Sequence, residues 1–141
     1  YNMCTKFFDA FFQNGGKTDI MGFSYYPYWV QMKHDEEKLT KDMTALADKY
    51  QKPLMLAEIG GPETEEKETY ELLCSAIRSI QAVPDYQGKG IFYWEPEVGA
   101  DLLPDQYPLG AARVNGEKNI QFTCVMNAYK DAQAEENKSN K

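Results

Sequence analysis

Short apolar runs alternate with stretches of helical spacing along the chain. Three runs are predicted to be β-strands: residues 19–29, 54–58 and 90–97. Between them, apolar residues recur every three or four positions, as on one face of a helix. The first stripe is Leu39, Met43, Leu46 and Tyr50, and the second is Tyr70, Leu73, Cys74, Ile77 and Ile80. This order predicts right-handed crossovers and a parallel sheet, hence an α/β fold.

Further helices are predicted at both ends. Near the start, one apolar face precedes the sequence Asn-Gly-Gly at residues 14–16, which suits a helix end. That face is formed by Met3, Cys4, Phe7, Phe8, Phe11 and Phe12. A weaker stripe runs from Val125 to Ala132. We expect one unit over residues 1–134 and a polar, disordered tail over 135–141.

The central run ends in a carboxylate. Leu54 to Ala57 form a continuous apolar stretch, typical of a strand covered on both faces, and Glu58 follows before Gly60 and Gly61. Carboxyl ends of parallel strands are where α/β folds bind ligands, so Glu58 is a candidate for chemistry. The alternative is a strand-end glutamate that only faces solvent.

Aromatic residues gather at the predicted strand ends. Their flat apolar faces and polar edges suit sugar rings, although core packing is the alternative for each of them singly. The group consists of Tyr25, Tyr26, Tyr28, Trp29, Tyr93 and Trp94.

Composition restricts the partners. A net charge of −7 argues against nucleic acid or an anionic membrane surface, and no apolar run approaches the roughly 20 residues of a membrane span. Cys4, Cys74 and Cys124 each fall within a predicted helix without paired spacing, so we expect buried free thiols.

Three strings carry a family resemblance: DIMGFSYYPYW at 19–29, LAEIG at 56–60 and GIFYWEP at 90–96. In order and spacing they resemble the last strands of glycoside hydrolase family 53, the arabinogalactan endo-β-1,4-galactanases. The resemblance implies the sixth, seventh and eighth strands of a (β/α)₈ barrel that cleaves β-1,4-galactan with retention. It also implies a secreted, periplasmic or cell-surface protein.

The chain is short for such a barrel. Its 141 residues compare with about 250 for a closed eightfold barrel. We therefore expect a C-terminal portion of the barrel, with a small complete α/β domain as the alternative. The rest of the barrel or another copy would then cover two strand edges and an apolar inner layer. That layer is expected to contain Ile20, Leu54, Leu56 and Phe92.

The resemblance also assigns roles. Glu58 matches the catalytic nucleophile, whereas the acid/base partner follows the fourth strand in an Asn-Glu pair that these 141 residues lack. Alternation along the first strand puts Tyr26 on the face of Gly22 and Ser24, so Tyr26 is expected to hydrogen-bond Glu58.

Other aromatic residues are candidates for binding the substrate. Trp94 matches a tryptophan that forms a sugar platform. Tyr28 and Trp29 are candidates for outer subsites, and Glu95 either binds substrate or braces the loop. The expected partner is the polysaccharide substrate, β-1,4-galactan.

The loop over 97–118 departs from the family pattern, so subsite preference is open. We expect no cofactor; the alternative is calcium held by Asp101 and Asp105. His34 is expected to begin a helix rather than do chemistry. Two other functions stay open: another retaining glycosidase of the same clan, such as a β-galactosidase or mannanase, and a non-catalytic sugar-binding half barrel.

Overall fold

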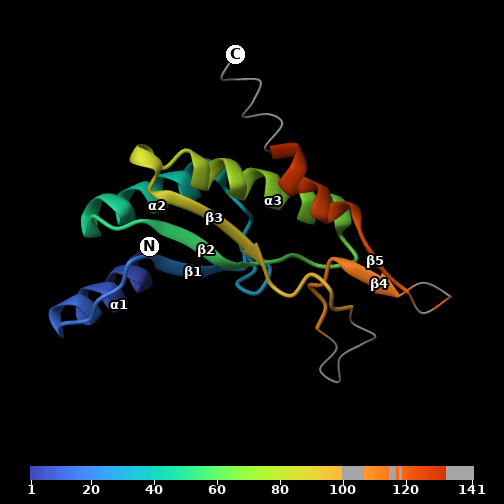
Figure 1. Ribbon diagram of the computed structural model, residues 1–141, viewed down its shortest axis with the longest axis horizontal. Coiled ribbons are helices and arrows are strands. Elements are labelled where there is room, and N and C mark those ends of the chain that lie inside the picture. The colour runs from blue at the N-terminus through green and yellow to red at the C-terminus, as the bar shows by residue number, and fades with distance from the viewer. Residues whose placement is uncertain (100–106, 115–116, 118, 133–141) are drawn as a thin grey trace, which may run out of the picture.

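The computed structural model describes residues 1–99, 107–114, 117 and 119–132 (Figure 1). The predicted tail over 135–141 lies outside these residues, and the single unit over 1–134 stays a prediction. The helices are α1 (Asn2–Gln13), α2 (Glu36–Tyr50) and α3 (Glu66–Gln81), the short 3₁₀ helices η1 (Pro84–Tyr86) and η2 (Cys124–Met126), and helical residues 127–132. The strands are β1 (Met21–Tyr25), β2 (Leu54–Ile59), β3 (Gly88–Tyr93), β4 (Ala112–Val114) and β5 (Ile120–Phe122).

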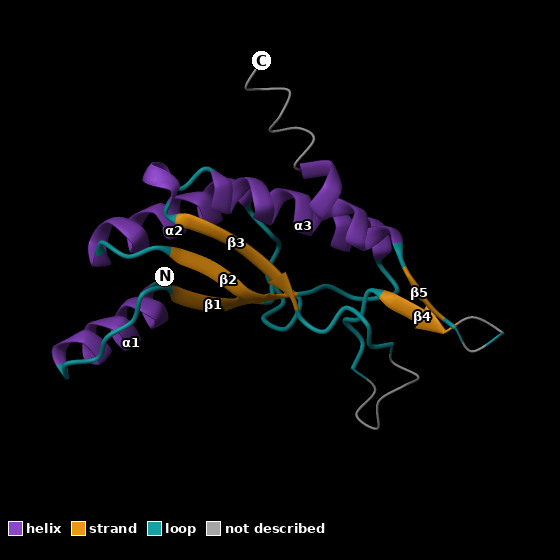
Figure 2. Cartoon of the chain, in the orientation of Figure 1, coloured by secondary structure: helices purple, strands orange, loops and turns teal. Residues whose placement is uncertain are grey.

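The predicted parallel sheet is confirmed. β1, β2 and β3 form one sheet in that order, and both neighbouring pairs are parallel. α2 joins β1 to β2 and α3 joins β2 to β3, so both connections are helical crossovers (Figure 2). The fold is therefore an α/β arrangement built on a parallel sheet.

The core lies between the sheet and its helices. β1 alternates buried Met21 and Phe23 with exposed Gly22 and Ser24, so one face of the strand packs and the other is open. The helices contribute the apolar stripes that their periodicity predicts. The main cluster includes Phe8, Leu39, Met43, Leu46, Leu54, Leu56, Ile59, Ala76 and Ile80.

The prediction that Leu54 and Leu56 belong to the apolar inner layer is wrong. Leu54 and Leu56 are 0% exposed and belong to the cluster on the helix side, rather than to the open face. Ile20 and Phe92 are exposed, at 43% and 63%. Alternation along β2 shows which residues share a face. It does not show which face packs against the helices, because both faces of this strand carry apolar residues.

Two strands end earlier than their apolar runs. β1 stops at Tyr25, because Pro27 lacks an N–H and the chain turns there, with Met32 N donating to the Pro27 carbonyl over 3.0 Å. β3 starts at Gly88 and stops at Tyr93. The region expected to be a long loop also contains an antiparallel pair, β4 and β5, of three residues each.

The cysteines differ from the expectation of buried thiols. Cys4 and Cys74 are partly buried in α1 and α3, and Cys124 is exposed. Cys124 begins a single 3₁₀ turn in which the next residue, Val125, is the buried one, and the Cys124 thiol lies 3.4 Å from Oε2 of Glu66. All three are free cysteines.

His34 lies in a chain of hydrogen bonds that joins β1 to α2 and α3. The Tyr25 hydroxyl is 2.8 Å from Nδ1 of His34, whose Nε2 is 2.6 Å from the Ser75 hydroxyl. Ser75 donates its one hydroxyl hydrogen to Glu36 over 2.6 Å, so Nε2 of His34 is the donor to Ser75 and Nδ1 accepts from Tyr25. Arg78 completes the group by pairing with Glu36 at 2.7 Å.

α2 begins one residue after His34. Asp35 is the N-cap, and its carboxylate accepts a hydrogen bond from the Lys38 N–H over 2.9 Å. His34 therefore precedes the helix start that the sequence predicts and holds neighbouring elements together.

Lowering the pH from 7 to 5.5 should lower the free energy of unfolding. Burial is the largest influence on His34 and lowers its pKa from 6.5, against the opposing effect of Glu36 and Asp35 and with a smaller lowering by Arg78. The unfolded chain then takes up the proton at higher pH than the folded one. Stability is therefore full above pH 6.5 and falls as the pH drops through the lowered folded value. Urea unfolding at several pH values measures this slope.

His34→Gln is the control for that measurement, because glutamine keeps hydrogen-bonding groups without titrating. The variant should flatten the pH dependence between pH 7 and 5.5. An unchanged slope in the variant would assign the effect to another group.

Candidate functional site

The carboxyl ends of the three parallel strands meet at one edge of the sheet. Glu58 lies near the end of β2, Tyr26 directly follows β1 and Trp94 directly follows β3. The Trp94 N–H donates to the Ile59 carbonyl over 3.0 Å, which continues the pairing of β2 with β3 past the end of β3. In Figure 1 the three arrowheads point to this edge.

Tyr26 and Glu58 are in contact. The Tyr26 hydroxyl donates to Oε2 of Glu58 over 3.3 Å, between groups 32 positions apart in sequence. Burial is the main cause that raises the pKa of Tyr26, followed by a hydrogen bond with Tyr107, so the phenol keeps its hydrogen at ordinary pH. The structure thus joins the two residues expected to meet, while their catalytic roles stay predictions.

A register shift determines where Glu58 sits. Phe23 pairs with Leu56, but the next residue, Ser24, pairs with Glu58, so Ala57 is an extra residue in β2. Such a bulge locally changes the direction of side chains. A Cβ on Gly22 would lie 3.2 Å from the Ala57 Cβ, so small residues keep the open face next to Glu58 shallow.

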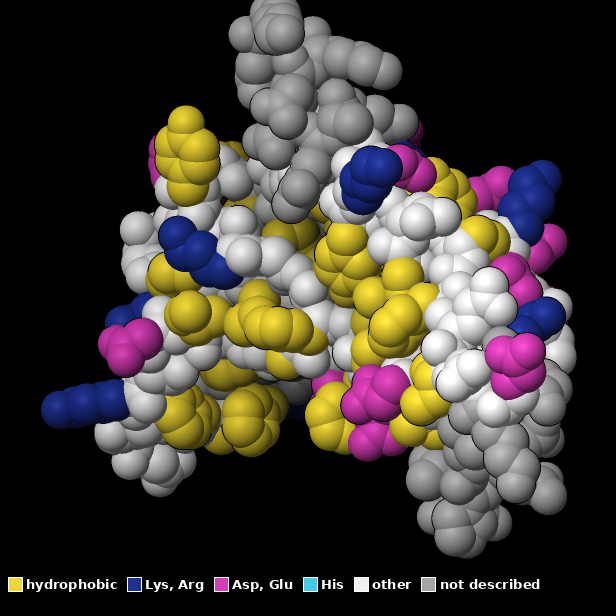
Figure 3. Space-filling view, turned by 45° about the vertical axis from the view of Figure 1, so that its right-hand side comes forward, with side chains coloured by type: hydrophobic (Ala, Val, Ile, Leu, Met, Phe, Trp, Pro, Cys, Tyr) yellow, Lys and Arg dark blue, Asp and Glu magenta, His cyan; other side chains and the backbone are white. Residues whose placement is uncertain are grey.

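Trp94 lies beside a groove on the β3 side of this edge. Its side chain is 48% exposed, and the groove has a volume of about 450 Å³. The lining residues are Ala57, Phe92, Tyr93, Trp94, Glu95, Pro96 and Glu97. Figure 3, which brings the strand ends forward, shows hydrophobic side chains gathered beside acidic ones. Exposed aromatic faces next to carboxylates suit a neutral sugar.

Tyr28 and Trp29 lie elsewhere. Both are in the turn after β1, with ring centroids 5.0 Å apart in an edge-to-face arrangement. Tyr28 lines a second groove of about 480 Å³, together with Met32, His34 and Thr69. This groove shares no lining residue with the groove at Trp94. The structure therefore does not bring Tyr28 to the groove of Trp94.

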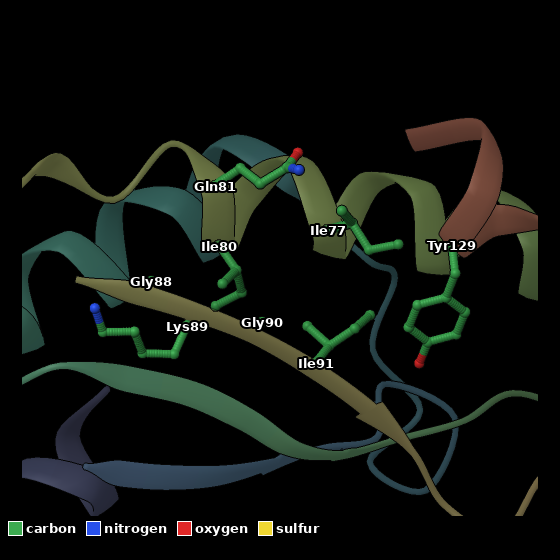
Figure 4. A pocket seen from close by; sticks show the side chains of 8 residues that line it. All are labelled: Ile77, Ile80, Gln81, Gly88, Lys89, Gly90, Ile91 and Tyr129. Atoms are coloured by element: carbon green, nitrogen blue, oxygen red, sulfur yellow. The ribbon is translucent and has the colours of Figure 1, made fainter. Parts of the chain in front are cut away.

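A third groove, of about 260 Å³, lies between α3 and β3 (Figure 4). Ile80 from α3 and Tyr129 from the C-terminal helical residues point toward the strand, near Gly88 and Ile91. It is on the helix side of β3, so it is separate from the edge that carries Glu58.

Sequence reasoning missed Tyr107. Its hydroxyl donates to the Trp94 carbonyl over 2.9 Å. Burial is the main cause that raises the pKa of Tyr107, and Glu95 and Glu58 add to it. The only signal in the sequence is an aromatic residue before a proline, in a loop that departs from the family pattern.

The segment after Tyr107 is fixed to the strand ends. Pro108 accepts from the Glu63 N–H over 2.8 Å, and Leu109 accepts from the Tyr93 hydroxyl over 2.7 Å. Ala111 donates from its N–H to the Pro96 carbonyl over 2.9 Å. Tyr93 ends β3, and Glu63 and Pro96 lie in the loops that follow β2 and β3, so these bonds hold residues 107–111 at the carboxyl ends of the strands.

The proposed calcium ligands Asp101 and Asp105 lie outside the described residues. Within the part of the chain that the structure describes, no group of three or more His, Cys, Asp or Glu side chains is arranged to hold a metal ion. The expectation of no cofactor stays untested. No helix in the described ranges is long and apolar enough to cross a membrane.

A parallel α/β sheet with carboxylates and exposed aromatic rings at its strand ends is typical of carbohydrate-active enzymes. The family model for glycosyl hydrolase family 53 matches residues 2–74, which is more than half of the chain and includes Glu58. The chain therefore belongs to glycosyl hydrolase family 53, and the resemblance seen in the sequence is confirmed.

Two further comparisons found similar proteins. A protein of Niallia circulans, described as uncharacterized and in the bgaB 5′ region, is 29% identical over 114 residues, covering 64% of this chain and 30% of that protein. A solved structure of a fungal β-1,4-galactanase matches with a TM-score of 0.60 and 18% identity, covering 79% of this chain and 37% of that one. The second likeness shows the fold. The chain spans about a third of the length of both.

Gly110→Ala should lower the free energy of unfolding by about 1–3 kcal/mol, the usual cost of overpacking. A Cβ at Gly110 would overlap the carbonyl oxygen of Val98, so backbone has to move. Gly60→Ala is the matched control, because its Cβ would lie 3.3 Å from the Trp94 carbonyl oxygen and needs only small shifts. Denaturant unfolding measures the free energy of unfolding of both variants. Equal losses of stability in the two would mean that residues 107–111 are loosely held.

Proposed function

We propose that the chain supplies the sixth, seventh and eighth strands of a (β/α)₈ barrel in a retaining endo-β-1,4-galactanase. The observation that carries the proposal is the contact of Glu58 with Tyr26 at the carboxyl ends of parallel strands, in a chain of family 53. The similar solved structure is of a β-1,4-galactanase, which supports β-1,4-galactan as the substrate. Galactan side chains of pectin and arabinogalactan belong to this substrate class.

Glu58 is the proposed nucleophile. In the first step its carboxylate oxygen attacks the anomeric carbon, and an acid protonates the departing glycosidic oxygen. In the second step the same partner removes a proton from water, which cleaves the glycosyl ester on Glu58 and restores the configuration. The neutral phenol of Tyr26 donates to the carboxylate and orients it for attack. This chemistry needs no cofactor.

The second carboxyl comes from outside this chain. A retaining mechanism needs it about 5–5.5 Å from Glu58, and the sequence contains no Asn-Glu pair of the kind that the family uses. The open sheet face supports a missing partner, because Ile20 and Phe92 are exposed there. We propose the rest of the barrel as that partner, with self-association as the alternative.

Trp94 is the proposed sugar platform. Its exposed ring lies beside the groove that Phe92 and Glu95 also line, so a pyranose can stack on the ring while a carboxylate accepts from a hydroxyl. Trp29 and Tyr28 are assigned to outer subsites rather than to the groove of Trp94. The family suggests action outside the cytoplasm, at the cell surface or in the surrounding medium.

Two alternatives use the same residues differently. Another retaining glycosidase would keep Glu58 and change the sugar, and a half-barrel module would bind sugar without cleaving it. The missing acid/base pair is the observation that favours the module. Hydrolysis of galactan, mannan and aryl galactosides by the assembled barrel separates the three.

A 2-deoxy-2-fluoro galactoside should form a covalent ester on Glu58 in the assembled barrel. The fluorine slows both steps, so the glycosyl-enzyme accumulates and peptide mapping identifies the labelled side chain. Glu58→Gln removes the attacking charge but keeps the shape, so it should abolish the ester while galactan binding is retained. A label on Glu95 or Glu97 would overturn the assignment.

Trp94→Ala serves as the contrasting variant in that experiment. It deletes a stacking surface rather than the reacting group, so KM should rise by about tenfold, equivalent to roughly 1.4 kcal/mol of binding, while the ester still forms.

The isolated 141-residue chain should show no measurable turnover of galactan. Loss of a general acid alone typically costs about 10²–10⁴-fold in rate. Mixing the chain with a separately produced portion that carries the first five strands should restore activity, measured as reducing ends released. Robust turnover by the purified chain alone would refute the missing-acid argument.

A further inference from the structure

The backbone of Trp94 is held on both sides of its Cα. The Trp94 N–H donates to the Ile59 carbonyl over 3.0 Å, and the Trp94 carbonyl accepts from the Tyr107 hydroxyl over 2.9 Å. Peptide groups are planar, so holding the two that flank a residue restrains its φ and ψ and the direction of its Cα–Cβ bond. One of these two bonds comes from β2, and the other comes from a side chain of the late segment.

The indole ring of Trp94 depends on this restraint more than a core side chain would. Trp94 is 48% exposed and lies beside the groove of about 450 Å³, whereas the preceding residue, Tyr93, is 8% exposed. A core side chain is held in place by close packing on all sides. A half-exposed ring lacks part of that packing, so the backbone that carries it has a larger share in placing it.

The stretch that follows Trp94 is stiff and is held by the same segment. Pro96 fixes its own φ and restricts Glu95 to extended conformations. The Pro96 carbonyl accepts from the Ala111 N–H over 2.9 Å. Residues 107–111 therefore bind two carbonyls of this stretch, those of Trp94 and Pro96.

The late segment is itself anchored next to Tyr107. The Glu63 N–H donates to the Pro108 carbonyl over 2.8 Å, and the Tyr93 hydroxyl donates to the Leu109 carbonyl over 2.7 Å. These bonds hold the two residues that follow Tyr107. The Tyr107 hydroxyl thus reaches the Trp94 carbonyl from a backbone that is already fixed at the strand ends.

We infer that Tyr107 is a positioning residue for Trp94, because its hydroxyl holds the Trp94 carbonyl and thereby sets the direction of the indole ring beside the groove. The inference rests on the proposed function only for the role of Trp94 as the sugar platform. A ring that is already in place loses less conformational freedom when a sugar stacks on it, so tighter binding is the expected benefit. Tyr107 acts through Trp94 and not on the sugar.

Tyr107→Phe tests the inference, because it removes the hydroxyl and keeps the ring. The chain is produced with 5-fluorotryptophan and assembled with an unlabelled portion that carries the rest of the barrel. The chain has two tryptophans, so it gives two fluorine-19 lines, which Trp29→Phe assigns. The Trp94 line should move by more than its width in Tyr107→Phe, while the Trp29 line stays in place.

Binding of a soluble β-1,4-galactan oligosaccharide measures the consequence for the platform. Its Kd should rise about threefold in Tyr107→Phe, within the worth of one hydrogen bond, and KM should rise with kcat little changed. The double variant Tyr107→Phe/Trp94→Ala should bind no more weakly than Trp94→Ala, because Tyr107 then has no ring to position. Losses that multiply in the double variant, or an unmoved Trp94 line in Tyr107→Phe, would overturn the inference.

Tyr70→Phe is the matched control. It also removes one phenol hydrogen bond of 2.9 Å, to Oδ2 of Asp131, between α3 and the C-terminal helical residues. Its loss of stability should resemble that of Tyr107→Phe, but neither the Trp94 line nor the Kd should change. Equal changes in the two variants would reduce Tyr107 to a structural role and overturn the inference.

A graded replacement covers the case in which Tyr107→Phe does not fold. 4-Aminophenylalanine in place of Tyr107 keeps the shape and a donor, but its N–H is a weaker donor than the phenol. The Trp94 line and the Kd should therefore lie between those of the unchanged chain and Tyr107→Phe. Values equal to those of the unchanged chain would count against the inference.

The fluorine spectrum, recorded without sugar, separates this inference from the proposed function. A moved Trp94 line in a barrel that binds no galactan would keep the hold of Tyr107 on Trp94 and refute Trp94 as a galactan platform. Galactan binding that is lost in Trp94→Ala, together with an unmoved line in Tyr107→Phe, would do the reverse.

Discussion

The central strand β2 connects the parallel sheet to the helices that cover it. It is hydrogen-bonded to β1 on one edge and to β3 on the other, and its buried residues Leu54 and Leu56 lie at 0% exposure against the helices. Burying one such side chain stabilises the fold by roughly 1.5–3 kcal/mol. The strand is therefore held by hydrogen bonds on both edges and by packing on one face. The candidate site lies at the end of this strand, where the bulge at Ala57 brings Glu58 opposite Ser24.

The site is assembled from backbone features as much as from side chains. The extra residue in β2 brings Glu58 opposite Ser24, and the turn at Pro27 ends β1 so that Tyr26 is free to reach across. Gly110 then permits the late segment to approach the strand ends closely. The Glu58 carboxylate accepts a hydrogen bond from the neutral phenol of Tyr26, which suits the nucleophilic role proposed for it.

The sequence predicted the sheet because its signals are local. The stripe containing Leu73 and Ile80 repeats with helical spacing, and Glu58 directly follows an apolar run. The contact between Tyr26 and Glu58 followed from strand alternation taken together with the family resemblance. The sequence did not predict that Leu54 and Leu56 face the helices. Both faces of β2 carry apolar side chains, and periodicity alone cannot orient such a strand.

Other features depended on contacts distant in sequence. β4 and β5 have three residues each, too few for alternation to be recognised. In the short turn that begins at Cys124, Val125 rather than Cys124 is the buried residue. The Tyr107 hydroxyl reaches the Trp94 carbonyl only because residues 107–111 fold back on the strand ends, which no local pattern encodes.

The parallel order also has a consequence for folding kinetics. Met21 pairs with Leu54 and Leu54 with Gly88, so the two crossovers close chain loops of nearly equal length and similar entropic cost. Each strand pairs with the one synthesised just before it. The sheet is therefore able to grow during translation, one crossover at a time, with the newest strand always at the edge.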